Sequence, residues 1–455
     1  MCGKILPVQL SILYKEELTV DLELRNLKGT KDYLPAEQQL RNRIRNTLEG
    51  VFTRYGCRPL ETPILCHYDI LASKYGGGEE ILKEVYSLKD QGDRELGLRY
   101  DLTVPFARVI GMNPNLRMPF KRYEIGRVYR DGPIKMGRLR EFMQCDVDIA
   151  GVRSPVAEAE LMAMALDAFG ELGLDVYISY NNRKLLSGVL ISLGIEEEQL
   201  NRVILSLDKL EKIGASGVQA ELHSNGIDAP VIERIFAAFE EEATTAYYES
   251  RYSHTLVKEG VAELNELDSY LHALKLDGKV RFNPLLARGL EIYTGTVYEV
   301  FLTDNTISGS IASGGRYDHI IGAFLESDVE YPAVGISFGL DVIFAALDMA
   351  GEGLETAPAD FFLIPLGTMA SCMEIAHSLR QAGLRVELEM AERRLRRSLD
   401  YANKESIPFV LILGENELAR QEINLRNMAG GKETSLPLEG LAEGLEEVLR
   451  GEDKG

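Results

Sequence analysis

Apolar positions recur along the chain at two spacings, and the changes between them divide the sequence into segments. From 37 to 55, apolar side chains lie three or four residues apart, which predicts a helix that ends at Gly56. Between 85 and 150, short apolar stretches separated by turn residues are typical of an antiparallel sheet. A further helix is predicted at 155–172.

The middle of the chain changes to a helical pattern. Residues 183–275 are rich in Leu, Ile, Glu and Ala at helical spacing, which predicts an inserted helical module. Strand patterns return at 279–303 and 308–316, and one more strand and helix are predicted from 334 to 349.

After a linker rich in Gly and Glu, strands and helices alternate, which predicts a compact α/β domain. The expected fold is therefore α+β, with an antiparallel sheet flanked by helices, a helical insertion and a C-terminal α/β domain. The predicted domains are an N-terminal extension at 1–25, the sheet domain at 26–182 and 276–350, the insertion at 183–275, a linker at 351–360 and the last domain at 361–455.

Composition and charge narrow the classes of protein that fit. The net charge of −21 argues against an indiscriminate nucleic-acid binder, although basic side chains can still gather locally. No apolar run is long enough to predict a membrane span, and the N-terminus lacks the features of a signal peptide. The five cysteines are scattered and the histidines show no ligand spacing, so we expect a cytoplasmic protein without structural zinc.

Basic residues are densest in the predicted hairpin at 126–151, around a Gly/Pro loop. Arginines on both arms can clamp a polyphosphate, because the planar guanidinium offers paired donors to phosphate oxygens. The alternative is an exposed hairpin with a solvated basic loop. Phe142, which could stack on a purine, shares one strand face with Gln144, Asp146 and Asp148, and a buried carboxylate there could receive a cationic or donor-rich group. The basic residues are Arg127, Arg130, Lys135, Arg138 and Arg140.

Three shorter segments add candidate polar groups. Asp101 and Thr103 lie two apart on a predicted strand face, a pairing suited to an α-ammonium group; the alternative is a strand end with a capping Thr. Arg288 precedes Gly289, which permits close approach of a ligand; the alternative is an arginine in a salt bridge near a turn. The Gly pair at 314–315, with Arg316 and Tyr317 behind it, is more typical of a plain turn than of a ligand contact.

Together these segments resemble the histidyl-tRNA synthetase family of class II aminoacyl-tRNA synthetases, from Asn26 to the C-terminal domain. RGLEIYTGTVYE (288–299) and SGGRYD (313–318) are the segments most specific to that family. The helix at 37–55 with Pro63 resembles the dimer-forming motif 1, and the segments at 386–404 and 409–418 resemble the anticodon-binding domain.

The resemblance implies an enzyme that activates histidine with ATP, accompanied by Mg²⁺, and loads it onto its tRNA. Arg130 and Arg288 would be catalytic at the α-phosphate, and Phe142 would stack on adenine. The implied histidine-binding residues are Asp101, Leu102, Thr103, Arg130, Gln144, Asp148, Arg288, Ile292, Tyr293 and Tyr317, with Asp148 and Tyr293 on the imidazole. The implied ATP-binding residues are Arg130, Arg138, Arg140, Phe142, Arg288, Gly335 and Gly339.

The resemblance also implies partners and an assembly. These are L-histidine, ATP, histidine tRNA and a second copy of the chain in a homodimer, with no metal-binding residues assigned and no membrane partner. A basic face on one predicted helix would bind the anticodon stem. Its residues are Arg393, Arg394, Arg396, Arg397 and Lys404.

The chain departs from the family pattern in three respects. Motif 3 usually ends in Glu-Arg, where this chain has Asp341 and Val342; Ile292 replaces the first of two tyrosines; and Gly132 stands where a hairpin Glu is common. We hypothesise that Arg138 or Arg140 supplies the missing charge. The loss at motif 3 also fits a silent histidine-binding paralogue that regulates an ATP phosphoribosyltransferase, and a tRNA-binding module without catalysis is a third possibility.

Overall fold

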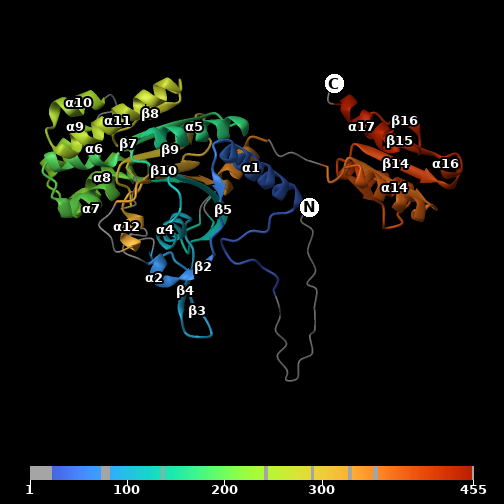
Figure 1. Cartoon of the computed structure of the whole chain (residues 1–455), viewed down its shortest axis with the longest axis horizontal. Coiled ribbons are helices and arrows are strands. Elements are labelled where there is room, and N and C mark those ends of the chain that lie inside the picture. The colour runs from blue at the N-terminus through green and yellow to red at the C-terminus, as the bar shows by residue number, and fades with distance from the viewer. Residues whose placement is uncertain are drawn as a thin grey trace. The chain divides into compact units, whose positions relative to one another are not determined.

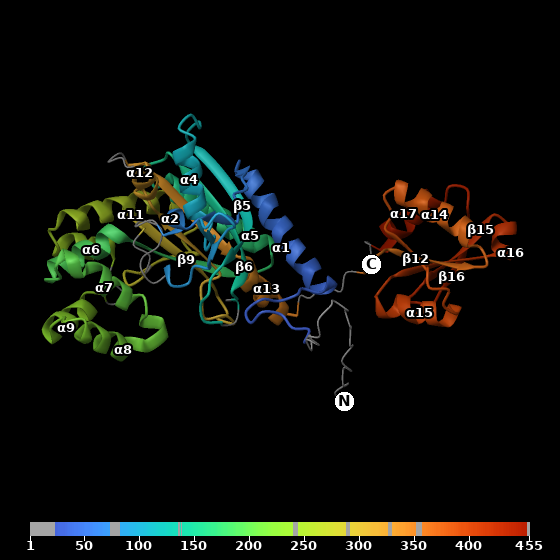
Figure 2. The same cartoon turned by 90° about the horizontal axis from the view of Figure 1, so that it is seen from below.

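The computed structural model describes residues 23–72, 82–134, 137, 139–239, 244–287, 292–325, 330–351 and 357–452. The chain forms two compact units, 1–352 and 353–455 (Figures 1 and 2). Among the helices within these ranges, none is both long enough and apolar enough to cross a membrane.

A mixed sheet forms the frame of the first unit, with eight strands within the described residues. Its two outer pairs, β1 with β5 and β7 with β8, are parallel, and all the inner pairs are antiparallel. The expected α+β class is confirmed, although no strand was predicted between 172 and 183, where β7 lies. In sheet order the strands are β1 Arg58–Pro59, β5 Phe120–Tyr129, β6 Glu141–Ala150, β11 Ala333–Gly339, β10 Ala312–Arg316, β9 Thr296–Leu302, β7 Val176–Asn182 and β8 Val280–Phe282.

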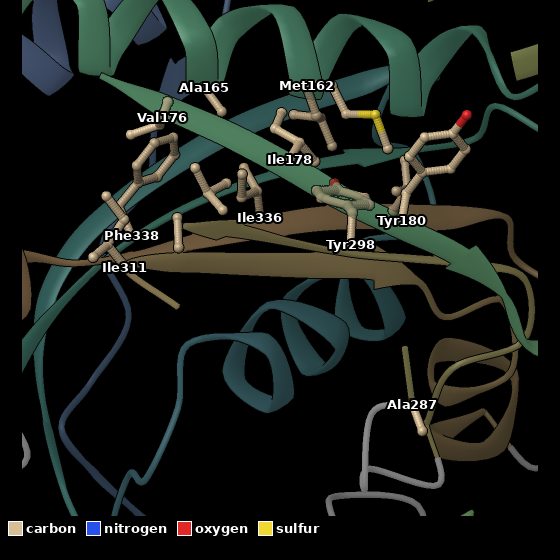
Figure 3. Packing of buried hydrophobic residues seen from close by; sticks show 14 of the residues in the cluster. Met162, Ala165, Val176, Ile178, Tyr180, Ala287, Tyr298, Ile311, Ile336 and Phe338 are labelled. Atoms are coloured by element: carbon tan, nitrogen blue, oxygen red, sulfur yellow. The ribbon is translucent and has the colours of Figure 1, made fainter. Parts of the chain in front are cut away.

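One face of this sheet is covered by three helices: α1 Pro35–Arg54, α5 Val156–Glu171 and α13 Leu340–Met349. The predicted helical face of α1 is buried there, with Ile44 and Leu48 fully inaccessible to solvent. Figure 3 shows α5 above the strands, with its apolar side chains packed against those of β7 and β11. Burial of this continuous apolar layer stabilises the sheet.

The opposite face is more polar and holds the candidate site. Helices α4 Thr103–Met112 and α12 Ile320–Phe324 form a small apolar cluster beside it. Because side chains alternate along a strand, the odd-numbered residues of β6 from Cys145 to Ile149 enter the core beneath α1 and α5. The even-numbered residues of β6 therefore point toward the α4 side. A three-stranded sheet of β2 Leu65–His67, β4 Glu95–Leu98 and β3 Ser87–Lys89, with α2 Tyr68–Leu71, belongs to the same unit.

A helical module follows β7, where the helical spacing predicted one. Its core is continuous with the main core of the first unit. The helices are α6 Arg183–Ser192, α7 Glu197–Leu207, α8 Leu210–Ser224, α9 Ala229–Ala238, α10 Thr245–Arg251 and α11 Thr255–Ala273.

Within the described residues 357–452, the second unit is a five-stranded sheet with helices on both faces. Helices α14 Met369–Gln381 and α17 Leu441–Glu452 pack on one face and α15 Leu395–Lys404 on the other. The predicted alternation of strands and helices is present, and β16, α16 Glu415–Ala419 and α17 add elements that were not predicted. In sheet order the strands are β13 Val386–Leu388, β12 Phe361–Leu366, β14 Phe409–Gly414, β15 Glu422–Asn427 and β16 Glu433–Pro437.

Candidate active site

A small pocket opens where β6, β11 and β10 run side by side. Six of the residues predicted to bind histidine or ATP line it, namely Thr103, Asp148, Ile292, Tyr293, Tyr317 and Gly335. The remaining lining residues are Asp146, Ser313, Gly314, Gly315, Ile336 and Ser337. Segments far apart in the sequence thus converge on one cavity.

The floor of the pocket is bare backbone. A Cβ atom on Gly335 would lie 2.0 Å from Oδ1 of Asp148, and one on Gly314 would lie 2.1 Å from the carbonyl oxygen of Gly335. The prediction that the Gly pair forms a plain turn is wrong, because β10 is hydrogen-bonded on both sides, to β9 and β11. Glycine is needed here because neighbouring strands leave no space for a side chain.

Asp148 is held by two neighbours on the α4 side of the sheet. Nη2 of Arg122 lies 2.6 Å from Oδ2 of Asp148, and the hydroxyl of Tyr317 donates a hydrogen bond to Oδ1. Burial raises the pKa of Asp148, and the charge of Arg122 opposes that rise. Both carboxylate oxygens are therefore engaged within the protein.

Arg122 was not predicted from the sequence to be a residue of the site. It is fully buried, donates to the carbonyl oxygen of Leu102 at 2.9 Å, and lies 4.6 Å from the ring centre of Phe106. In the β5–β6 register it stands directly opposite Asp148. An arginine at an inward position of a predicted strand was the available signal.

Asp146 and Gln144 lie on the same face of β6 as Asp148. Nε2 of Gln144 donates to Oγ of Ser337 at 2.9 Å, while its Oε1 has no hydrogen-bond partner among the described residues. Oδ1 of Asp146 likewise lacks a partner within the described ranges. Burial raises the pKa of Asp146 to about 8, with Arg122 acting in the opposite direction. Asp146 lines the pocket, so its Oδ1 is an acceptor available to a bound ligand, whereas the predicted histidine-binding residue Gln144 is not among the lining residues.

The prediction that Asp101 and Thr103 share a strand face is wrong. Strand β4 ends at Leu98, and Thr103 is the first residue of α4. Oδ1 of Asp101 accepts a hydrogen bond from the backbone N–H of Val104 at 3.1 Å, which satisfies an otherwise unpaired donor of the first helical turn. Burial raises the pKa of Asp101 to about 6. The helix start still brings Thr103 to the pocket wall.

Arg130 follows β5 and lies beside the aromatic ring predicted to stack on adenine. Its Nε donates to the carbonyl oxygen of Tyr100 at 2.9 Å, and its guanidinium carbon lies 5.2 Å from the ring centre of Phe142. Arg288 and Arg138 lie outside the described residues. Nη2 of Arg140 is 3.1 Å from Oδ1 of Asp131, so this arginine already has an acidic partner.

The two residues at the motif 3 position, Asp341 and Val342, contact other parts of the first unit. Asp341 accepts hydrogen bonds from Tyr33 and Arg41 through Oδ1, and from the backbone N–H of Met143 through Oδ2 at 2.8 Å. A Cβ on Gly137 would lie 3.0 Å from Cγ2 of Val342, so this valine packs against the hairpin loop. Gly339 ends β11 immediately before this junction.

The residues predicted to bind the anticodon are not all on one helix, which corrects that prediction. Helix α15 begins at Leu395, so Arg393 and Arg394 precede it, whereas Arg396, Arg397 and Lys404 lie on it. All five are exposed. Arg393 is engaged locally, with its Nη1 3.1 Å from Oε2 of Glu389 and its guanidinium over the ring of Tyr401.

Comparison with known proteins gives consistent matches over nearly the whole chain. A family model described as histidyl-tRNA synthetase matches residues 29–343, and an anticodon binding domain matches 360–448. Histidine–tRNA ligase 1 of Bacillus cereus is 56% identical over 424 residues, covering 92% of this chain and 99% of that protein. Histidine–tRNA ligase 2 of Shouchella clausii is 50% identical, covering 91% and 98% respectively.

Solved structures agree with the fold. The crystal structure of histidyl-tRNA synthetase from Nostoc sp. PCC 7120 matches with a TM-score of 0.80 and 31% identity, covering 94% of this chain and 99% of that one. An ATP phosphoribosyltransferase regulatory subunit/histidyl-tRNA synthetase from Bacillus halodurans C matches with a TM-score of 0.70 at 20% identity, covering 86% and 97%. The second likeness concerns the fold alone.

Proposed function

The chain belongs to the histidyl-tRNA synthetase family and is a histidine–tRNA ligase, and from this premise we propose that the pocket beside Asp148 holds its histidine substrate. The enzyme activates histidine with ATP to histidyl-adenylate and transfers the histidine to its tRNA. The observation that carries the proposal is the convergence of Thr103, Asp148, Tyr293 and Tyr317 on one cavity.

The pocket suits an imidazole because the polar side chains of Asp148, Tyr293 and Tyr317 line it beside glycine backbone. Asp148 lines the pocket and is held between Arg122 and Tyr317, so its carboxylate keeps a fixed orientation in the pocket wall. A bound side chain without ring nitrogens would leave buried polar groups unpaired. Such unpaired groups permit discrimination by factors of about 10⁴ or more.

The activation step needs positive charge beside the α-phosphate. Attack by the histidine carboxylate on the α-phosphorus moves negative charge onto phosphate oxygens, and preorganised cations there stabilise the transition state. We assign this role to Arg130 and Arg288. Arg130 lies beside Phe142 and is fixed by the carbonyl oxygen of Tyr100, which supports its placement next to a stacked adenine.

We propose that Mg²⁺ accompanies ATP. Within the described residues, no group of three or more His, Cys, Asp or Glu side chains is placed to hold a metal ion. Mg²⁺ commonly keeps several waters and binds through phosphate oxygens with one or two carboxylates, so it does not require a protein cage. When bound, it would neutralise charge on the phosphates.

The homodimer and the cytoplasmic location remain predictions. A silent regulator of an ATP phosphoribosyltransferase is not better supported, because curated ligases match over more than nine-tenths of the chain. A tRNA-binding module without catalysis predicts tRNA binding with no activation of histidine.

Histidine-dependent exchange of pyrophosphate into ATP, measured without tRNA, tests the function. We expect exchange with histidine and none with phenylalanine, because the latter lacks ring nitrogens. Histidine binding without exchange would instead favour a regulator of an ATP phosphoribosyltransferase. Binding of tRNA alone would favour a tRNA-binding module without catalysis.

A further inference from the structure

Asp146 is a buried carboxyl group to which the family resemblance gives no role. It lines the pocket and is only 3% exposed to solvent, and its Oδ1 has no hydrogen-bond partner within the described residues. A buried polar atom without a partner is costly unless a ligand supplies one. The position of this oxygen in the pocket wall therefore points to a substrate contact.

Its neighbour on the same strand face is in a different state. Asp148 is neutralised by the guanidinium of Arg122 and receives the hydroxyl hydrogen of Tyr317. In the sheet register, Asp146 instead stands between Glu124 of β5 and Ser337 of β11, so no cation is directly opposite it. Oδ2 of Asp148 also has no hydrogen-bond partner among the described residues, but it lies 2.6 Å from the guanidinium of Arg122, whereas Oδ1 of Asp146 has neither a hydrogen bond nor an ion pair there.

We propose that Asp146 binds the substrate directly: its carboxyl carries a proton in the empty pocket, releases that proton to solvent on binding, and then accepts a hydrogen bond from an N–H of histidine. The inference rests on the proposed function of the pocket. The carboxyl O–H bond breaks, the proton passes to the buffer, and the carboxylate formed faces a donor that histidine supplies from its ammonium group or its ring.

The charges around Asp146 explain both protonation states. Arg122 and Glu124 face it from β5, Asp148 from its own strand, Asp101 from the segment before α4, and the hydroxyl of Tyr317 from the end of β10. This set contains three carboxyl groups, Glu124, Asp148 and Asp101, and one arginine, Arg122. Burial sets the pKa of Asp146 at about 8, so the acid is neutral at pH 7 while the pocket is empty. A nearby N–H donor stabilises the ionised form and lowers that pKa.

Proton release on histidine binding tests the inference. Titration calorimetry at pH 7, in two buffers with different ionisation enthalpies, gives the number of protons released per histidine bound. We expect the wild-type enzyme to release about one proton more than Asp146→Asn, because the amide does not titrate. We also expect Asp146→Asn to bind histidine about ten- to a hundredfold more weakly, as for loss of a hydrogen bond to a charged group. Equal proton release by the two proteins would overturn the inference.

Two analogues identify the N–H donor. Imidazolepropionate keeps the ring and lacks the amine, whereas histidinol keeps both the amine and the ring. Extra release by the wild-type enzyme with both analogues assigns the contact to the imidazole. Extra release with histidinol alone assigns it to the ammonium group. If the wild-type enzyme and Asp146→Asn release the same number of protons with histidine and with both analogues, a substrate contact at Asp146 is contradicted.

Two controls separate this inference from other failures. Asp304→Asn replaces an exposed carboxylate that bonds only within its own turn, and should leave proton release and affinity unchanged. Thermal unfolding reports whether Asp146→Asn folds, and Asp146→Ser is a smaller second variant that also removes the titrating group. If the wild-type enzyme neither binds histidine nor supports exchange, the proposed function fails; if it does both and Asp146→Asn matches it, only the role of Asp146 fails.

Discussion

At the scale of single residues, Arg122 carries a positive charge in an environment that excludes water. Its side chain lies between Asp148 at 2.6 Å and Glu124 at 3.7 Å, and all three residues are buried. A buried charge that loses its partner is expensive, whereas an exposed ion pair contributes little. The stability of the pocket therefore depends on this arginine more than on an exposed basic residue of the hairpin such as Arg127.

Replacing Arg122 by methionine should lower the free energy of unfolding by about 3–5 kcal/mol, because it leaves the buried carboxylate of Asp148 without a cation, while Glu124 keeps its ion pair with Arg99. Urea denaturation followed by circular dichroism measures the change. Arg25→Met is the matched control, since Arg25 forms an exposed ion pair with Glu23 and its loss should cost less than about 1 kcal/mol. Similar small losses in both variants would remove Arg122 from this role.

The carboxyl of Asp146 should make the stability of the free enzyme depend on pH. In the unfolded chain it titrates near its ordinary pKa of about 3.9, and in the folded protein near 8. The folded state thus binds the extra proton between these values, so stability falls as pH rises through that window and levels off above about 8. Melting temperatures from pH 5 to 9 should fall less steeply for Asp146→Asn; parallel profiles would contradict the raised pKa.

At the scale of elements, the start of α13 joins three parts of the first unit. Asp341 accepts hydrogen bonds from Arg41 of α1, from Tyr33 before that helix, and from the backbone of β6 at Met143. Its place in the first helical turn also suits the partial positive charge of the helix N-terminus. The acidic residue of motif 3 thus keeps a structural function, while the arginine position holds an apolar contact.

Asp341→Ala should destabilise the first unit by about 3–5 kcal/mol, because Arg41 is buried and would lose its partner. The free energy of unfolding in urea measures this. Asp348→Ala, at the exposed end of the same helix, should change it by less than about 0.5 kcal/mol. A loss confined to catalysis, with unchanged unfolding, would mean that Asp341 does not tie these elements together.

Segments with a clear apolar pattern could be predicted from the sequence, including the three-residue β13, whereas the seven-residue β7 and the twelve-residue α17 were missed. Each arm of the hairpin of β5 and β6 is ten residues long, and both arms were predicted as strands. The segment from Asp101 to Thr103 is too short to show a period, and the end of β4 depends on its pairing with β2 and β3. Arg122 could not be assigned to Asp148 because their proximity depends on the strand register, which composition and spacing do not contain.

At the scale of the whole molecule, charge is distributed unevenly. The chain carries a net charge of −21, yet α15 presents Arg396 and Arg397 on an exposed surface. Local positive charge in an acidic protein can bind a polyanion selectively, because repulsion elsewhere disfavours other orientations. We therefore expect the second unit to contribute to tRNA binding and not to histidine activation.

Replacing both Arg396 and Arg397 by glutamine should raise the KM for tRNA and leave tRNA-independent pyrophosphate exchange unchanged. The dependence of log KM on log salt concentration should become shallower by roughly one for each tRNA phosphate that the variant no longer neutralises. Aminoacylation assays over a range of salt concentrations measure both effects. Arg420→Gln removes an exposed arginine already paired with Glu417 and serves as the control; an equal effect there would argue for general charge alone.

The bare floor of the pocket restricts how the enzyme could be redesigned. Two strands approach so closely at Gly314 and Gly335 that any other amino acid would collide with main-chain or carboxylate atoms. A library of variants selected to accept bulkier histidine analogues should therefore keep these two glycines and vary residues of the pocket wall such as Ile292 and Ser313. In such a selection, we expect every surviving clone to retain both glycines.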